Sequence, residues 1–225
     1  MRQLLRGIHR FQNNAFLARR ELFADLAKGQ RPQAVFVTCC DSRIDPTLIT
    51  QTEPGDLFVI RNIGNIVPAY HPAITGDSVA AALEYAVGVL GIRDLIICGH
   101  SHCGAVRALL DPAQADKLPS VRDWLGHAEA TKRIMRENYS HLSGEALLNV
   151  AVQENVLVQL EHLRSHPALV AAIARGELNL HGWVYKIETG DIFAYDAAGE
   201  QFLPIGETAV AERVVAERAV TADAI

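Results

Sequence analysis

Two short clusters of reactive side chains lie far apart in the sequence. Cys39 is followed by Asp41 and Arg43 in the segment VFVTCCDSRIDP, and His100 is followed by Cys103 in CGHSHCGAV. Two thiolates and one imidazole form a Cys2His donor set, which is found in catalytic zinc sites that leave a fourth position free for water. The softness of these donors favours zinc over magnesium or calcium. The sequence therefore predicts a zinc site at which a water molecule is activated.

A second arrangement of the same residues stays open. A closed structural zinc site would take Cys40, His102 or Asp41 as a fourth protein ligand. Other reactive motifs are not found. A phosphate-binding P-loop needs Lys and Ser or Thr after Gly104, where Ala105 and a valine stand, and no GxGxxG or Cys-x-x-Cys motif is present.

The pair formed by Asp41 and Arg43 favours the catalytic alternative. Side chains alternate along an extended segment, so residues 39, 41 and 43 are expected to point in one direction. Arg43 is then able to hold Asp41 in a two-pronged hydrogen-bonded pair. We expect the fixed carboxylate to accept a hydrogen bond from a zinc-bound hydroxide and to orient its lone pair. The alternative is an ordinary salt bridge, which we consider less favoured beside a Cys2His cluster.

Three short apolar strands are predicted, and two of them end at the reactive clusters. The strands cover 34–39, 57–62 and 94–99. Helices are predicted over 77–91, with Asp77 as the N-cap, and from Gly104 to Leu110. This alternation predicts an α/β fold with a mainly parallel central sheet flanked by helices. Ligands bind beyond the carboxyl ends of the strands in such sheets, so the two clusters are expected to meet in space.

The chain is expected to consist of an arm, one catalytic domain and a tail. Residues 1–28 form an N-terminal helical arm of two helices, 29–200 the zinc-binding α/β catalytic domain, and 201–225 a C-terminal tail. Within the domain, helices are predicted over 120–138 and 144–166, followed by a short helix to Arg175. A C-terminal β-hairpin is predicted over 178–196, turning at residues 189–191.

Composition limits the classes of function. Hydrophobic side chains make up 49% of the 225 residues and charged ones 21%, which is typical of a globular protein with a sizeable core. The formal net charge of -5 argues against a nucleic-acid partner. No apolar run of about 18 residues and no secretory signal is found, so we expect no membrane partner and a cytoplasmic location. The four cysteines are then expected to stay reduced, available for metal binding or chemistry.

The pattern C-x-D-S-R from residue 39, followed by H-x-x-C-G from residue 100, resembles that of the β-class carbonic anhydrases. The segments AKGQRPQ, EPGDLFVIRNIGN and ALEYAVGVLG are also similar to this family, in its bacterial and cyanobacterial branch. The resemblance implies reversible hydration of carbon dioxide to bicarbonate and a proton through a zinc-bound hydroxide, with one Zn2+ per chain. The implied zinc ligands are Cys39, His100 and Cys103, and the implied catalytic pair is Asp41 with Arg43.

The resemblance also implies how the substrate is bound. The family's plant-like subgroup has a glutamine before the first strand and a phenylalanine and a tyrosine in the pocket. The matching substrate-binding positions are Gln30, Phe58 and Tyr85, together with Gly104. Another subgroup has a tryptophan three residues before the first zinc cysteine, as part of an inhibitory bicarbonate site. Phe36 stands there, so we expect no such site and an open fourth zinc position near neutral pH.

Family members form homodimers, often dimers of dimers, with the pocket at the subunit boundary. The N-terminal arm is similar to the segment that embraces the partner subunit. Some relatives are carboxysomal, so carboxysome components are candidate partners and the carboxysome is an alternative location. Two other functions stay open, namely hydrolysis of carbonyl sulfide or carbon disulfide at the same centre, and a catalytically silent zinc scaffold. Cys40 and Cys98 are predicted to be buried packing thiols, and His181 and Trp183 to be structural.

Overall fold

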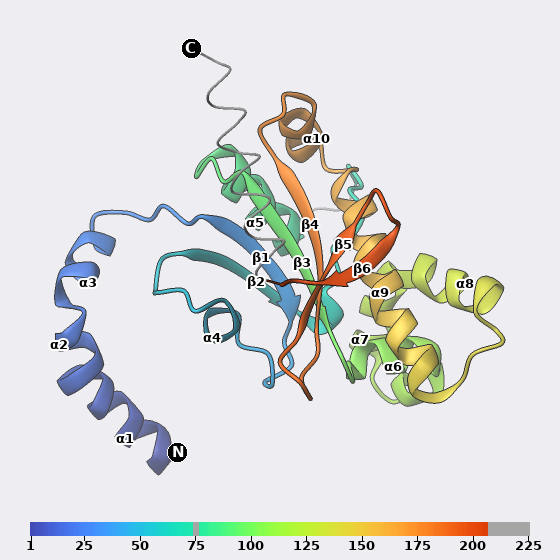
Figure 1. The fold of residues 1–225 in the computed structure, drawn as a ribbon, viewed down its shortest axis with the longest axis horizontal. Coiled ribbons are helices and arrows are strands. Elements are labelled where there is room, and N and C mark those ends of the chain that lie inside the picture. Colours follow the sequence, from blue (N-terminus) through green and yellow to red (C-terminus); the bar gives the residue numbers. More distant parts are fainter. Residues whose placement is uncertain (74–76, 207–225) are drawn as a thin grey trace.

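A six-stranded sheet organises the molecule, for which a computed structural model describes residues 1–73 and 77–206 (Figure 1). The strand order is β2-β1-β3-β4-β5-β6; β2, β1, β3 and β4 pair in parallel, and β5 and β6 are antiparallel. The strands are β1 (Ala34–Cys39), β2 (Leu57–Asn62), β3 (Asp94–His100), β4 (Asn179–Tyr185), β5 (Ile192–Asp196) and β6 (Gln201–Pro204). The predicted mainly parallel α/β fold and the hairpin are confirmed.

Helices surround this sheet and form the N-terminal arm. The arm contains α1 (Arg2–Arg10), a π-helical turn (Phe11–Ala15), α2 (Phe16–Ala18) and α3 (Arg20–Leu26). The body contains α4 (Pro46–Thr50), α5 (Ser78–Gly88), α6 (Gly104–Leu110), α7 (Pro119–Leu125), α8 (Glu129–Asn138), α9 (Gly144–Leu163) and α10 (Pro167–Ala174). Short 3-10 turns cover Ile63–Asn65, Pro112–Ala115 and Gly126–Ala128. Within the described residues, no helix has the length and apolar character needed to span a membrane.

The central strands are buried on both faces, which explains their unbroken apolar sequence. Every residue of β1 is buried. Val35 and Val37 belong to the main core, to which α5, α6 and α9 contribute. Phe36 lies in a second, smaller cluster with Ile44 and Ile96. One face of the sheet is therefore covered by the large main core, and the other face is covered by the smaller cluster.

Strand β2 is an edge strand, so the interpretation of the apolar run 57–62 as a buried strand is wrong. Ile60 is its buried residue, whereas the other side chains of β2 are partly or fully exposed. A short apolar run does not distinguish a central strand from an edge strand, because both need residues that favour extended backbone. Among residues 1–73 and 77–206, no further strand pairs with the outer side of β2.

Three predicted boundaries also differ from the structure. The predicted helix over 120–138 is divided into α7 and α8 by a 3-10 turn at Gly126–Ala128. The arm breaks at Arg19, whose φ and ψ of -117° and 24° are not helical. Residues 201–204, which were assigned to the tail, form β6 and extend the hairpin to three strands. The rest of the predicted tail, from residue 207 onward, lies outside the described residues.

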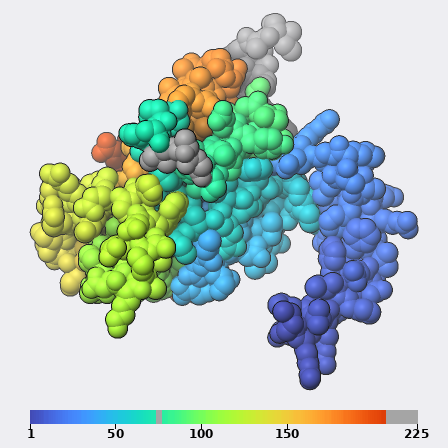
Figure 2. Space-filling view, turned by 180° about the vertical axis from the view of Figure 1, so that it is seen from behind, coloured from blue at the N-terminus to red at the C-terminus, as the bar shows by residue number. Residues whose placement is uncertain are grey.

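The arm extends away from the body and contributes no buried residue to its core. None of the residues of α1, α2 and α3 is buried, and Figure 2 shows the arm as a separate lobe with a hollow between it and the body. Its apolar side chains are exposed: Leu4 is 67% exposed, Ile8 54% and Leu17 55%. An exposed apolar surface of this kind marks an interaction site.

Candidate metal centre

The two reactive clusters meet at the carboxyl ends of adjacent parallel strands. Cys39 is the last residue of β1, His100 is the last residue of β3, and Cys103 directly precedes α6. Because β1 and β3 are paired neighbours, their ends bring these residues together. The two sulfurs and a ring nitrogen of His100 all lie within 4.8 Å of one another, and all three residues are buried. The predicted convergence of Cys39, His100 and Cys103 is therefore observed.

The imidazole of His100 is oriented for metal binding. Its Nδ1 lies 2.9 Å from the carbonyl oxygen of Ser101, which accepts a hydrogen bond from it. The proton on Nδ1 leaves the lone pair on Nε2, and Nε2 is buried without a hydrogen-bond partner among residues 1–73 and 77–206. An unpaired buried nitrogen costs free energy unless a ligand satisfies it. This atom, beside two sulfurs, fits a soft cation such as zinc.

The side chains of Cys39 and Cys103 form a hydrogen-bonded pair in which the thiol of Cys103 donates to the sulfur of Cys39. The hydrogen bond from Cys103 lowers the pKa of Cys39, and the neighbouring His100 and the amide of Gly64 act in the same direction against the effect of burial. The pKa of Cys103 is raised, because its thiol donates to Cys39 and is buried. One thiolate therefore forms readily, and a cation bound here would take the place of the remaining proton.

Asp41 and Arg43 form the predicted pair beside the cluster. Arg43 Nε lies 2.9 Å from Asp41 Oδ1 and Arg43 Nη2 lies 2.7 Å from Asp41 Oδ2. The backbone N–H of Arg43 donates to Oδ1 as well, at 3.0 Å. These donors hold the pKa of Asp41 well below its usual range. Asp41 Oδ2 also lies 3.9 Å from His100 Nε2, so the carboxylate faces the ligand atoms.

Asp41 and Arg43 were predicted to point toward Cys39 because side chains alternate along an extended strand, and this explanation is wrong. Strand β1 ends at Cys39, and the backbone then turns, with the N–H of Ile44 donating to the carbonyl of Asp41 at 3.2 Å. A residue that the sequence did not identify holds this turn: Arg61 donates to the carbonyl oxygens of Cys39, Asp41 and Ile44 at 3.1, 2.7 and 3.0 Å. The signal in the sequence that could have identified Arg61 was a basic residue near the end of an otherwise apolar strand.

The turn Ile63–Asn65 closes the other side of the centre. The amide N–H of Gly64 donates to Cys39 Sγ at 3.4 Å. Trp124 Nε1 donates to the carbonyl of Ile63 at 2.7 Å, and Asn155 Nδ2 donates to the carbonyl of Gly64 at 3.0 Å. Gly64 has a φ of +81°, and a Cβ there would lie 3.0 Å from Cβ of Ala105, so a glycine is required. Sequence reasoning missed Trp124 and Asn155, which lie far from the motif.

The predicted substrate-binding residues do not all lie at this centre. Gly104 is at the centre, directly after Cys103. Phe58 pairs with Val35 in the register that pairs Cys39 with Asn62, so it lies four residues, or about 13 Å, back along the sheet. Tyr85, on α5, has its ring 6.4 Å from that of Phe58. Gln30 is exposed between α3 and β1. The structure thus separates these three residues from the centre of their own chain.

The two remaining cysteines differ in environment. Cys98 is buried in β3 as predicted, and burial raises its pKa to about 12. The prediction that Cys40 is a buried packing thiol is wrong, because Cys40 is exposed. Strand β1 ends one residue before it, so the strand pattern that would have buried its side chain no longer applies.

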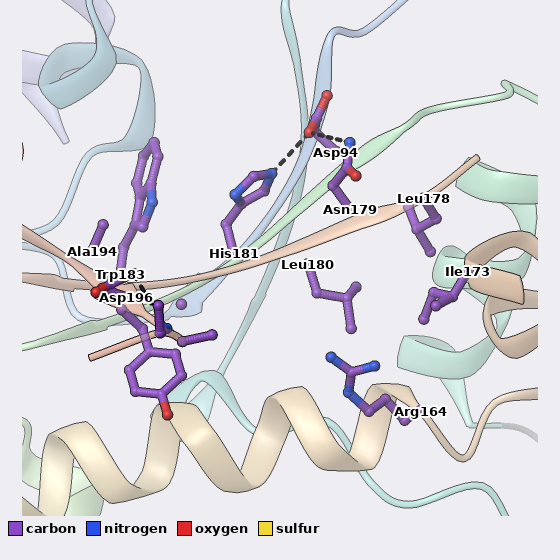
Figure 3. Close-up of a pocket in the computed structure, with 14 residues that line it drawn as sticks. Asp94, Arg164, Ile173, Leu178, Asn179, Leu180, His181, Trp183, Ala194 and Asp196 are labelled. Atoms are coloured by element: carbon purple, nitrogen blue, oxygen red, sulfur yellow. Dashed lines mark hydrogen bonds and ion pairs between the residues drawn. The ribbon is translucent and has the colours of Figure 1, made fainter. Parts of the chain in front are cut away.

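A separate cavity lies away from this centre, at the amino end of β4. It has a volume of about 610 Å3 and is bounded by residues of β4, β5 and the end of α9 (Figure 3). Figure 3 shows His181 and Asn179 directed toward Asp94, with His181 Nε2 2.8 Å from Asp94 Oδ1. Cys39 and His100 lie at the opposite, carboxyl ends of the strands. The cavity is therefore separate from the Cys2His cluster, and the structural role of His181 stays a prediction.

This fold and site define a class of protein: α/β proteins with a buried Cys2His centre at the carboxyl ends of a parallel sheet. Comparison with known proteins gives the family: residues 34–192 match the family described as carbonic anhydrase, and the chain belongs to that family, in its β-class. The resemblance drawn from the motifs is thereby confirmed, and the chain is an enzyme of this family.

Individual relatives agree with this assignment. A carbonic anhydrase of Pseudomonas aeruginosa is 51% identical over 207 residues, covering 92% of this chain and 93% of the relative. A carbonic anhydrase of Synechocystis is 50% identical over 204 residues, covering 90% of this chain and 74% of the relative. The solved structure of the β-carbonic anhydrase CcaA is 50% identical and superposes with a TM-score of 0.88, covering 91% of this chain and 99% of that one.

Proposed function

We propose that this enzyme hydrates carbon dioxide reversibly to bicarbonate and a proton, using one zinc ion held by Cys39, His100 and Cys103. Carbon dioxide hydration is the general activity of its family. The observation that carries the proposal is the convergence of two sulfurs and one ring nitrogen within 4.8 Å. Zinc bound to three protein ligands supplies a Lewis acid that lowers the pKa of water from 15.7 to about 7.

The protein residues prepare the reacting water and its surroundings. Asp41 stays ionised because Arg43 donates to both of its carboxylate oxygens. The carboxylate accepts a hydrogen bond from the reacting water, which aims the lone pair of the water at the carbon of CO2. Arg61 fixes the backbone that carries this pair, and the positive charge of Arg43 keeps Asp41 from taking up the proton. Because both carboxylate oxygens of Asp41 accept hydrogen bonds from Arg43, the pair supports our prediction that Asp41 leaves the fourth zinc position open to water.

The pocket is proposed to be completed by a second copy of the chain. Phe58 and Tyr85 lie on and beside the edge strand β2, away from the centre of their own chain. Tyr85 is 45% exposed, so it is free to contact a neighbouring subunit. We propose that Gln30, Phe58 and Tyr85 of one subunit bind CO2 at the centre of the other, where an apolar wall and one amide suit a linear, nonpolar substrate.

The apolar arm supports a homodimer or a dimer of dimers. Its exposed leucine, isoleucine and phenylalanine side chains find no partner surface in their own chain, as the burial of the described residues shows. A solved structure from Sordaria macrospora, described as that of tetrameric β-carbonic anhydrases, is 28% identical and has a TM-score of 0.77 over 86% of this chain. We propose a cytoplasmic location, with the carboxysome as the alternative; fractionation of cells that contain the tagged protein would distinguish them.

The Asp41→Ala variant tests the proposed function. We expect it to retain zinc, measured by elemental analysis, and to lose most of its CO2 hydration in a stopped-flow assay. Asp25→Ala is the matched control, because it also removes a carboxylate that pairs with a basic residue, Lys28, at 2.8 Å, but in the arm. Unchanged turnover in Asp41→Ala would refute the role of Asp41. Purified protein without stoichiometric zinc would refute the proposed function itself.

The two alternative functions are tested with the same preparations. Release of sulfide from carbonyl sulfide or carbon disulfide, measured beside CO2 hydration, distinguishes a hydrolase of CO2 analogues. A zinc-loaded protein that turns over neither substrate would be a silent scaffold. The intact pair of Asp41 and Arg43 argues against a scaffold, because a structural zinc site has no need of an orienting carboxylate.

A further inference from the structure

We propose that Trp124 is a positioning residue for the thiolate of Cys39, because its indole N–H holds the peptide group that donates a hydrogen bond to the sulfur. The inference deepens the proposed function and rests on it, since it concerns a metal bound to Cys39. Trp124 belongs to α7, outside the sheet and well removed in sequence from every predicted ligand. Neither the motif nor the resemblance assigns it a role.

The geometry is that of a relay through one peptide group. Trp124 Nε1 donates to the carbonyl oxygen of Ile63 at 2.7 Å, and the amide of Gly64 donates to Cys39 Sγ at 3.4 Å. The carbonyl of Ile63 and the amide of Gly64 belong to the same planar unit, so they cannot rotate independently. The indole that fixes the carbonyl therefore also fixes the direction of the amide N–H toward the sulfur.

The backbone at this point needs such an external anchor. Gly64 has a φ of +81° and no side chain with which to hold itself in place. Asn155 fixes the following peptide group by donating to the carbonyl of Gly64 at 3.0 Å. Trp124 fixes the preceding one, and its own ring is packed edge-on against His127, with centroids 5.3 Å apart. The two anchors together leave the Gly64 amide in one orientation.

The relay affects the charge on the sulfur as well as its position. A donor at a carbonyl oxygen strengthens the N–H of the same peptide as a donor, by roughly 10–30% for a hydrogen bond in such a chain. A stronger N–H donor withdraws charge from the thiolate, which then gives less charge to the bound cation. The cation is left more electron-poor and a better Lewis acid. Trp124 is thus expected to tune the metal without touching it.

A Trp124→Phe variant of the cobalt-substituted holoenzyme tests this relay. The substitution keeps an aromatic ring and removes the N–H donor. We expect the sulfur-to-cobalt charge-transfer absorption to move to lower energy, because the sulfur donates more strongly. In the diamagnetic zinc form of the same variant, we expect the Gly64 amide proton resonance to move upfield. The control is Trp183→Phe, which removes the other indole of the chain, packed against Phe36 on the far side of β1, and should move neither signal. A purely structural role for Trp124 would change stability but not the band energy.

A second measurement covers the case in which Trp124→Phe fails to fold. In the Trp183→Phe background, Trp124 is the sole tryptophan, and biosynthetic replacement by a benzothiophene analogue exchanges its N–H for sulfur with almost no change of shape. The same two shifts support the proposal. A folded protein whose absorption band and Gly64 resonance match those of its parent overturns it, while CO2 hydration by the zinc form leaves the proposed function standing. Wild-type protein that shows no charge-transfer band overturns both, because no thiolate then binds the metal.

Discussion

Two inactive variants are predicted to restore activity when they are mixed as subunits of one dimer. Asp41→Ala removes the orienting carboxylate, and Phe58→Ala removes a proposed wall of the pocket. Each homodimer carries its defect at both centres. In a mixed dimer, one centre takes both defects, and the other combines an intact Asp41 with an intact Phe58 from the neighbouring subunit.

The strand register explains why restored activity requires a second subunit, and the number of intact centres sets the size of the restored turnover. Phe58 lies about 13 Å along the sheet from the level of Cys39, which is too far for its ring to contact a substrate at that centre. It must therefore act across a subunit boundary if it acts on the substrate at all. With one active centre out of two, purified mixed dimers should show roughly half of the wild-type turnover.

The assay uses two different affinity tags, so that sequential purification isolates the mixed dimers from coexpressed chains. Stopped-flow CO2 hydration is then compared with that of each homodimer at equal zinc content. A repeat with Tyr85→Ala in place of Phe58→Ala removes a residue that is 45% exposed and therefore costs the core less. Mixed dimers as inactive as their parents would refute the shared pocket. Full activity of the Phe58→Ala and Tyr85→Ala homodimers would refute the substrate role of both residues.

Four further outcomes are expected. Arg43→Gln removes the donors that depress the Asp41 pKa, so it should destabilise the protein at neutral pH, by about 1 kcal/mol or less at this half-exposed pair. A depressed carboxyl pKa stabilises the folded state fully above the unfolded pKa of about 3.9. The difference in Tm from the wild type should therefore shrink as the pH falls below that value, and disappear only as the pH falls through the lower pKa of the folded state. Removal of zinc by a chelator should abolish hydration and lower Tm, and added zinc should restore both; an unchanged Tm would contradict metal binding by the folded state. Gly64→Ala places an L-residue at a φ of +81°, at a cost of about 1–2 kcal/mol, and should weaken zinc binding about tenfold in a chelator competition. Cys40 should be alkylated rapidly in the folded holoenzyme and Cys98 should not, as peptide mass spectrometry would show; equal protection of both thiols would contradict the exposure of Cys40.

The convergence of two cysteines and one histidine was predictable from the sequence, because the carboxyl ends of neighbouring parallel strands lie at one edge of a sheet. Apolar runs identify β1 and β3, and reactive residues directly after such runs must share the carboxyl edge if the strands are neighbours. Cys39, His100 and Cys103 could thus be brought together without any knowledge of tertiary contacts. The motif spacing and its resemblance to a family then supplied the chemistry.

Contacts that depend on tertiary packing could not be predicted in this way. Arg61 and Trp124 donate hydrogen bonds to backbone carbonyls, and any carbonyl within reach would satisfy the same donor. Their residue types therefore do not indicate which carbonyl each one binds. Asp41 was predicted to face the ligands, but through an extended backbone, whereas a turn achieves this. The exposure of Cys40 has the same origin, because the residue at which a strand ends is the least certain feature of a sequence pattern.

The placement of the proposed ligands on separate strands has a consequence for how the enzyme would acquire a zinc ion. A nascent chain exposes Cys39 long before His100 and Cys103 are synthesised, and their long-range approach requires β1 and β3 to pair first. Local zinc motifs capture the ion early and fold around it, but here the sheet must assemble before the cation is held. Zinc delivery is therefore expected to follow maturation of the polypeptide, and a metal-starved cell should accumulate folded apoprotein that is ready for loading.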